Sequence, residues 1–335
     1  MATIRDVARE AGVSIATVSA TLNGTKKVSD KLQVRVRDAV DKVGYAPNAL
    51  AQSLKRGATR NIGLVIPDIT NAFFAKLARA VETAASDRGY TVLLCNTDED
   101  PEKERAYLRL LRTQRVVGVI LAPAGSGAEY GAELSREVEG PGVFIDRLAE
   151  GPDWDSVVVD NVTGVRDAMN HLIALGHRHI AAVFGRAQVS TTLERMEGYR
   201  QALAAAGIEP DPSLIRVRCS GHDRSYRATQ AVLDRPDRPT ALFTSNNSVT
   251  LGAMHALRDM GLACPDDISV IGVDGLEWAN AISPGLTTIE QPAADMGARA
   301  VSMLLERLEN AGSAVSQTRL PVDLILRKSC AAPKR

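Results

Sequence analysis

Charged and amide side chains follow several short apolar runs, and their types suit a ligand that carries many hydroxyl groups. Asp146 and Arg147 come directly after one such run, and Asp274 comes directly after another. A carboxylate accepts hydrogen bonds from hydroxyl groups, and a planar guanidinium donates them in a fixed geometry. We expect further polar contacts from residues near helix starts and in a crossing segment: Thr191, Arg195, Asn247 and Gln291.

Two adjacent aromatic residues, Phe73 and Phe74, follow the loop that begins at Asp68. Adjacent aromatic residues at the start of a helix usually place at least one ring in the core. At the mouth of a cleft, the two rings would instead sandwich the apolar face of a sugar ring. The pair therefore adds an apolar surface to the polar set.

No pattern of catalytic or metal-binding residues accompanies this set. The chain lacks the GxxxxGK[ST], GxSxG and HExxH motifs, and its four cysteines form no CxxC pair. His177 and His179 stand two residues apart at the entry to a strand, so their side chains point to opposite faces. We therefore expect no metal, no cofactor and no enzymatic activity.

From residue 61 onward, β-branched runs alternate with amphipathic helical segments, which is typical of parallel sheets covered on both faces. The alternation restarts near residue 161 and so predicts two α/β lobes, with the ligand at the carboxyl ends of their strands. The first lobe would contain residues 61–160 and 292–320, and the second residues 161–291 and 321–335. The expected strands are 62–66, 92–94, 117–121, 180–184, 215–217, 241–243 and 268–273, and the expected helices are 73–88, 102–114, 161–175, 192–206, 223–234 and 248–260.

The 335 residues carry no net charge, but the charge is unevenly distributed. The first 60 residues contain eleven Lys and Arg against five Asp and Glu, a net charge of +6 that the rest of the chain balances. A small basic unit attached to a larger acidic one indicates contact with a polyanion. The sequence has neither an 18-residue apolar stretch nor an apolar N-terminal run, so we expect a cytoplasmic protein.

Three short helices are predicted within residues 1–46. Thr3 and Asp6 form a capping box at the start of the first helix, which ends at Gly12. Ser14 caps the second helix, over residues 15–22, and Ser29 caps the third. Two short helices joined by a tight turn and braced by a third form a helix-turn-helix unit, and the positive charge makes this a predicted DNA-binding unit.

The segments ATIRDVAREAGVSIATVSATLNG and VSDKLQVRVRDAVDKVGYAPNALAQSLKRG resemble the DNA-binding headpiece of the lactose/galactose repressor family. The resemblance continues through the chain and implies a homodimer whose second helices lie in the major groove of a palindromic operator. The apolar side chains of Ile15, Ala16 and Ala20 would then contact thymine methyl groups. Further DNA contacts implied by the resemblance are Thr3, Ser14, Thr17, Ser19, Asn23 and Lys26.

Residues 47–60 resemble the hinge helix and linker of the same family. The helical part is shorter than the roughly 12–15 residues that an isolated helix needs in water. The resemblance implies that two copies fold together in the minor groove. Leu54 would then insert as a wedge between base pairs, with Lys55 beside it.

The polar residues of the two lobes resemble the pocket of ribose-type sugar-binding proteins and their repressor relatives, within a periplasmic-binding-protein fold. Purine-responsive members of the family have Trp, Gly and Arg where this chain has Arg147, Asn246 and Val189. An aromatic residue of the ribose pocket is absent near Ser220, and Trp278 would fill that space. We therefore expect a monosaccharide as effector, with a purine or nucleoside as the alternative.

These observations predict a ligand-responsive transcriptional regulator, and specifically a repressor of sugar metabolism. The predicted fold is a small all-α headpiece followed by a two-lobed α/β domain. A secreted sugar-transport receptor would share the cleft but would lack the headpiece. A sugar-processing enzyme is the more remote alternative, because it would need a catalytic base and a phosphate or metal site that the sequence does not show.

Overall fold

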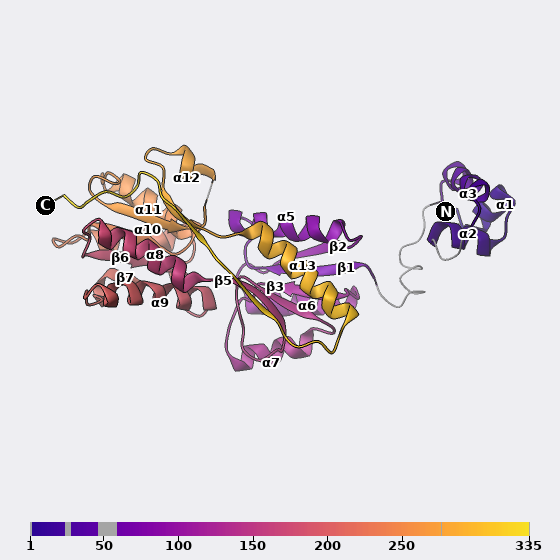
Figure 1. Ribbon diagram of the computed structural model, residues 1–335, viewed down its shortest axis with the longest axis horizontal. Coiled ribbons are helices and arrows are strands. Elements are labelled where there is room, and N and C mark those ends of the chain that lie inside the picture. Colours follow the sequence, from indigo (N-terminus) through magenta and orange to yellow (C-terminus); the bar gives the residue numbers. More distant parts are fainter. Residues whose placement is uncertain (1, 24–27, 46–58, 276, 335) are drawn as a thin grey trace. The chain divides into compact units, whose positions relative to one another are not determined.

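The chain separates into two compact units, residues 1–59 and 60–335. The computed structural model describes residues 2–23, 28–45, 59–275 and 277–334 of them (Figure 1). Three of the expected DNA contacts, Lys26, Leu54 and Lys55, lie outside the described residues, as does most of the predicted hinge helix. Their roles stay predictions.

The first unit contains three helices, α1 (Ile4–Ala11), α2 (Ile15–Asn23) and α3 (Asp30–Val43). The Thr3 N–H and hydroxyl both donate to the Asp6 carboxylate, as the capping-box pattern predicts. Gly12 ends α1 with a φ of 60°, a left-handed conformation that glycine adopts without steric cost. The Ser14 hydroxyl accepts a hydrogen bond from the Thr17 N–H at 3.1 Å and so caps α2.

One fully buried valine from each helix, Val7, Val18 and Val36, closes the core of this unit. The guanidinium of Arg35, on α3, donates to the carbonyl of Ala11 at 2.5 Å. This bond ties the turn between α1 and α2 to the third helix. The helix-turn-helix is therefore held by its core and by a side chain that reaches the turn itself.

The second unit contains two six-stranded sheets (Figure 1). All neighbouring strands are parallel except β12, which runs antiparallel to β10. The first sheet has the order β11 (Gln317–Leu320), β5 (Asp155–Val159), β4 (Gly142–Ile145), β3 (Gly118–Leu121), β1 (Asn61–Ile66) and β2 (Thr91–Asn96). The second has the order β12 (Asp323–Ile325), β10 (Thr287–Glu290), β9 (Ser269–Val273), β8 (Ala241–Thr244), β6 (Ile180–Val183) and β7 (Ile215–Arg216).

Helices cover both faces of each sheet, and each sheet with its helices is called a lobe below. Separate clusters of buried apolar side chains lie on the two faces of each sheet. The first lobe has α5 (Ala72–Ser86), α6 (Pro101–Thr113), α7 (Ala128–Glu137) and α13 (Ala293–Glu309). The second has α8 (Asn161–Ala174), α9 (Ser190–Ala205), α10 (His222–Leu233), α11 (Asn247–Asp259), α12 (Glu277–Ala281) and the short 3₁₀ turn η1 (Pro212–Leu214).

The chain crosses between the lobes three times, after β5, after β10 and between β11 and β12. Figure 1 shows the last of these crossings as a yellow segment that runs along both lobes. Each expected strand and helix is present within two residues of its predicted ends. The alternation of β-branched and amphipathic segments was therefore a reliable guide, because buried parallel strands need continuous apolar runs.

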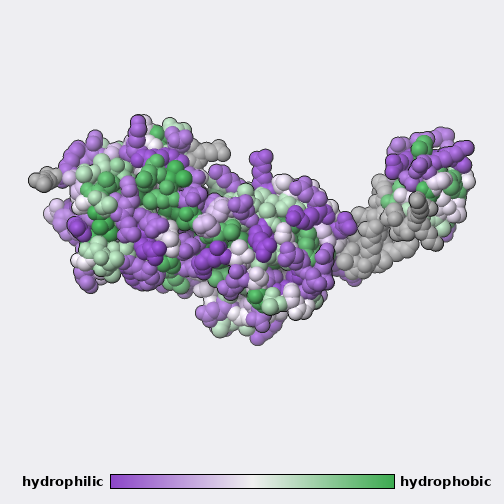
Figure 2. Space-filling view, in the orientation of Figure 1, coloured by the Kyte–Doolittle hydropathy of each residue, from purple (hydrophilic) through white to green (hydrophobic). Residues whose placement is uncertain are grey.

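The surface of residues 60–335 seen in Figure 2 is mostly hydrophilic, with hydrophobic residues gathered in separate patches. Within the described parts of the chain, no helix is both long and apolar enough to span a bilayer. The same residues include no group of three His, Cys, Asp or Glu side chains arranged to hold a metal ion.

His177 is a structural residue of the second lobe. It is 1% exposed, and burial lowers its pKa. Its Nε2 lies 2.9 Å from the carbonyl oxygen of Ala331, and its Nδ1 lies 2.8 Å from the Thr240 hydroxyl. Since a carbonyl can only accept, Nε2 carries the proton and Nδ1 accepts from Thr240. The imidazole thus links the C-terminal segment to the sheet.

Replacing His177 with alanine should lower the free energy of unfolding by about 1–3 kcal/mol, because two buried polar groups lose their partner. Urea denaturation of the full chain measures this. The matched control is His179→Ala, since His179 is partly exposed and should change stability by less than about 0.5 kcal/mol. Equal losses in the two variants would contradict the structural role.

Candidate functional site

A cavity of about 810 Å³ opens in the second unit, lined by residues that follow strands of both sheets. This is the place where doubly wound sheets bind ligands, because loops and helix starts gather at the carboxyl ends of the strands. We call it the effector cleft. Eight of the ten expected effector contacts line it: Phe73, Phe74, Asp146, Arg147, Thr191, Arg195, Asp274 and Gln291.

Asp146 and Asp274 occupy corresponding places in the two lobes, one after β4 and the other after β9. Both adopt left-handed backbone conformations, with φ of 65° and 74°. The N–H of Asp146 donates to the Val157 carbonyl at 3.0 Å, and that of Asp274 donates to the Ile289 carbonyl at 2.9 Å. Non-glycine residues in this region are strained, and such strain concentrates at ligand sites. The backbone turn directs both carboxylates into the cleft.

Burial dominates the acid–base chemistry of these two carboxylates. It raises the pKa of Asp146 to about 6, although Arg147 and Arg195 act in the opposite direction. It also raises the pKa of Asp274, which Arg195 and a hydrogen bond from Gln291 partly offset. Burial therefore makes the charged forms of these two carboxylates costly.

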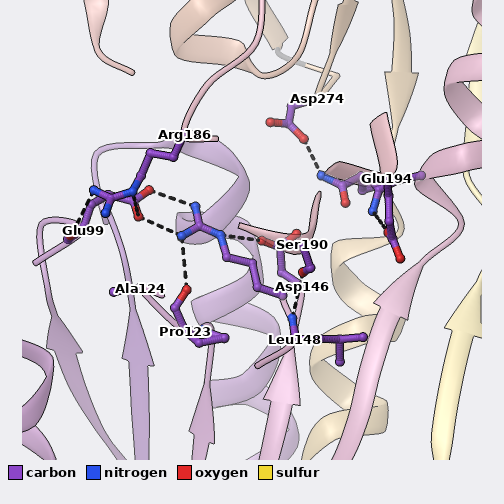
Figure 3. A network of polar contacts seen from close by, with 12 residues as sticks. Glu99, Pro123, Ala124, Asp146, Leu148, Arg186, Ser190, Glu194 and Asp274 are labelled. Atoms are coloured by element: carbon purple, nitrogen blue, oxygen red, sulfur yellow. Dashed lines mark hydrogen bonds and ion pairs between the residues drawn. The ribbon is translucent and has the colours of Figure 1, made fainter. Parts of the chain in front are cut away.

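Arg147 is held through its two terminal nitrogens, which leaves its Nε without a hydrogen bond to the described residues. Its two terminal nitrogens donate to the two oxygens of Glu99 at 2.7 and 2.8 Å, and one of them also donates to the Pro123 carbonyl at 3.3 Å (Figure 3). The guanidinium also lies over the Phe74 ring, 5.7 Å from its centroid. None of the described residues accepts a hydrogen bond from Nε, which lies 3.6 Å from an Asp146 oxygen.

Arg195 projects from α9 of the second lobe and is also fixed by hydrogen bonds. Its Nε donates to the Asn161 side chain at 2.8 Å, and a terminal nitrogen donates to the Ser245 carbonyl at 2.6 Å. Asn161 in turn donates to Glu194 at 2.8 Å. The guanidinium is 6% exposed and is therefore presented to the cleft in one orientation.

Amide side chains complete the cleft. The Gln291 amide donates to Asp274 at 2.6 Å, while its Oε1 is buried and accepts no hydrogen bond from the described chain. Asn247 does not line the cavity; its amide instead donates at 2.6 Å to Asn71, which does. Asn71 also caps α5 through the Phe73 N–H at 3.0 Å. The hydrogen bond between Asn247 and Asn71 joins the second lobe to the first.

The two aromatic rings differ from the expected arrangement. The rings of Phe73 and Phe74 meet edge to face, with centroids 5.1 Å apart and an angle of 67° between their planes. They are 7% and 4% exposed and belong to the core of the first lobe. The two rings therefore cannot enclose a sugar between parallel faces, because packing against the sheet sets their angle. They form an apolar floor instead.

The structure adds residues that the sequence pattern did not indicate. Glu99, Asn71 and Arg186 line the cleft, and Asn161 orients Arg195 from behind it. Glu99 follows β2, so applying the strand-end rule to every strand would have found it. Trp278 belongs to α12, but its side chain is outside the description, so its predicted role stays untested.

Helix α2, which is expected to lie in the major groove, has an exposed face and a buried face. Ile15 is 46% exposed and Ala16 is exposed, while Thr17 and Ser19 are partly exposed. Ala20 is only 8% exposed in this unit, and its contact with a base edge stays a prediction. A single methyl group is short enough for neighbouring side chains to shield it. Thr3 and Ser14 are exposed, and Asn23 ends α2, with its side chain outside the description.

Comparison with known proteins agrees with this architecture. Residues 3–48 match the family described as bacterial regulatory proteins, lacI family, and residues 169–330 match a periplasmic binding protein-like domain. The HTH-type transcriptional repressor PurR of Vibrio atlanticus is 39% identical over 310 residues, which cover 92% of this chain and 93% of the repressor.

Two solved structures are similar over most or all of the chain. A putative ribose operon repressor from Burkholderia thailandensis is 36% identical with a TM-score of 0.73, over 79% of this chain and 98% of that one. The lac repressor dimer bound to operator and an anti-inducer is 29% identical with a TM-score of 0.89, over 99% of both chains. The resemblance noted from the sequence is confirmed: this chain belongs to the lacI family of bacterial regulatory proteins and is a transcriptional repressor, not an enzyme.

Proposed function

We propose that this repressor binds a palindromic operator as a dimer and responds to a monosaccharide held in the effector cleft. One observation carries the effector assignment. Carboxylates and guanidiniums from both lobes line one cavity, and Arg147 Nε and Gln291 Oε1 lack hydrogen-bond partners among the described residues. A buried polar atom without a partner costs about 1–3 kcal/mol. A ligand with many hydroxyl groups supplies the missing partners.

The types of the cleft residues favour a sugar. Carboxylates only accept hydrogen bonds and guanidiniums only donate them, whereas each sugar hydroxyl can do both. Asp146 and Arg147 reach such a ligand from the first lobe, and Arg195 and Asp274 reach it from the second. A bound sugar therefore joins the lobes, and closure of the cleft depends on it. The edge-to-face rings of Phe73 and Phe74 supply an apolar floor for the carbon face of the ring.

A purine effector is the second candidate, and the names of the curated relatives favour it. The compared relative from Vibrio atlanticus is a PurR repressor. A purine base presents two flat faces, which suit parallel aromatic partners, and the described cleft residues place no such pair around the cavity. The relative named as a putative ribose operon repressor supports the sugar. On the geometry of the cleft, we infer a monosaccharide.

The DNA-binding proposal depends on charge and on the exposed face of α2. Ile15 and Ala16 are exposed there and can contact thymine methyl groups. Thr17 and Ser19 carry hydroxyl groups that suit phosphate oxygens. The similar lac repressor structure contains a dimer on its operator, which supports the same arrangement here.

Asp274→Asn should weaken binding of D-ribose by about 10–150-fold, because a hydrogen bond to a charged group contributes about 1.5–3 kcal/mol. Isothermal titration calorimetry on the full chain measures this, with hypoxanthine as the competing purine probe. Asp266→Asn is the matched control, since Asp266 is an exposed carboxylate on the same lobe. Wild-type protein that binds hypoxanthine and no sugar would replace the proposal with the second candidate.

The affinity for D-ribose should fall as the pH falls through about 6, by up to about tenfold per pH unit. The reason is that Asp146 has a pKa of about 6 and accepts hydrogen bonds best when ionised. Binding favours the ionised form, so it should release protons near pH 6. Calorimetry in two buffers of different ionisation enthalpy detects this release. If the Asp146→Asn variant releases as many protons on binding D-ribose as the wild type, another group must be the one that titrates.

Operator affinity should fall about 10³–10⁵-fold between 50 and 200 mM salt if two headpieces together neutralise about 6–10 phosphates. Fluorescence anisotropy with a labelled operator measures the slope. Binding of D-ribose by the same protein serves as the control, because an uncharged ligand releases no counterions. A flat salt dependence for DNA would contradict the headpiece assignment.

A further inference from the structure

Glu99 joins the two lobes at the edge of the effector cleft. It follows Asp98 in the loop after β2, and both residues have left-handed backbones, with φ of 54° for Asp98 and 63° for Glu99. Two consecutive non-glycine residues in this region are strained. The loop thus holds the Glu99 side chain, which is 24% exposed, in a particular place.

Two guanidiniums meet at this carboxylate, one from each lobe (Figure 3). Arg147 of the first lobe donates to both carboxylate oxygens, at 2.7 and 2.8 Å. Arg186 of the second lobe places its Nε 3.7 Å from one of the same oxygens, and its Nη1 donates to the Glu99 carbonyl at 2.9 Å. One acidic residue therefore neutralises cationic groups from both walls of the cleft.

We propose that Glu99 determines the specificity of the effector cleft, admitting uncharged sugars and excluding phosphorylated ones. The inference rests on the proposed sugar effector and narrows its class. It follows from the position of the Glu99 carboxylate on the guanidinium of Arg147. A guanidinium binds phosphate through two parallel N–H groups, and Glu99 already takes that edge of Arg147. A phosphate at this place would also face the carboxylate itself.

The charges around Glu99 support the exclusion. Arg147 and Arg186 both pair with this one carboxylate, at 2.7 and 3.7 Å. Burial disfavours the Glu99 carboxylate, but the bonds and charges of Arg147 and Arg186 outweigh this and keep its pKa below the usual range. Glu99 is therefore ionised at neutral pH. Removing its charge takes the shared carboxylate away from both guanidiniums, which leaves them able to bind an anion.

The same contacts give Glu99 a positioning role. By holding both terminal nitrogens of Arg147, it leaves Nε as the nitrogen of that guanidinium without a hydrogen-bond partner among the described residues. An uncharged sugar can accept a hydrogen bond from Nε without disturbing the ion pair. A loosened Arg147 would lose this orientation, and the affinity for a neutral sugar would fall with it.

The test compares D-ribose with D-ribose 5-phosphate by calorimetry on the full-length chain. Glu99→Gln should weaken binding of D-ribose about tenfold and strengthen binding of the phosphate about tenfold or more. Glu99→Asp keeps the charge on a shorter side chain, so it should weaken ribose binding while still rejecting the phosphate. This pair of variants separates the charge of Glu99 from its reach.

Glu102→Gln is the matched control. It removes the same charge three residues away, but the Glu102 side chain is 79% exposed, does not line the cavity and pairs with Arg105 rather than with the cleft guanidiniums. It should leave both affinities within about twofold. An equal gain of phosphate binding in Glu102→Gln would overturn the proposal, because a general loss of negative charge would then suffice. So would unchanged selectivity in Glu99→Gln.

A second test uses inorganic phosphate as the probe, so it examines the role of Glu99 without relying on a bound sugar. If wild-type protein binds neither ribose nor any other sugar, the proposed function fails, and the phosphate probe decides the role of Glu99 separately. Millimolar phosphate should raise the melting temperature of Glu99→Gln and leave that of wild type and Glu102→Gln unchanged. An absence of stabilisation in Glu99→Gln, when that variant is folded, would contradict the exclusion mechanism.

Discussion

The rest of the structure depends on one constraint, which is that four charged side chains remain buried together where two lobes meet. Asp146, Arg147, Arg195 and Asp274 are each at most 8% exposed. An isolated buried charge is expensive, so each of these groups needs an opposite charge or a fixed hydrogen-bond partner. The strained backbone at the two aspartates and the bidentate grip of Glu99 on Arg147 are both ways of meeting that need.

The partners of these buried charges lie partly in the segments that cross between the lobes. Arg195 is held by Asn161, the first residue of α8 after the first crossing. Asn161 shares Glu194 with Arg319, whose ion pair with Glu194 measures 2.9 Å and which lies in β11 before the last crossing. Arg319 also donates to the Val159 carbonyl at 2.9 Å. Contiguous contacts therefore connect Arg195 to two of the three crossings.

Much of the fold could be predicted because its determinants are local and repeated. Apolar runs mark the buried strands, and Ser14 and Gly12 mark helix ends by what their backbone and side chains can do. The polar residues that follow predicted strands, Asp146 and Asp274 among them, also gave the position of most of the cleft. What could not be predicted depends on packing between distant segments. The angle between the Phe73 and Phe74 rings, the burial of Ala20 and the grip of Glu99 on Arg147 are set by neighbours that no local pattern specifies.

Effector class is the property that the shared fold constrains least. The residues that build two sheets and three crossings are distributed along the whole chain, and the 39% identity with a PurR repressor extends over 310 residues. Selectivity instead depends on the few atoms that face the cavity. Val189 and Ser220 contribute neither a charge nor an aromatic ring there, while Glu99 neutralises cationic groups from both walls. Arg147 Nε and Gln291 Oε1, which are unpartnered among the described residues, are the atoms on which the proposed sugar effector depends. Overall similarity therefore identifies the family, whereas the effector has to be argued from the atoms of the cleft.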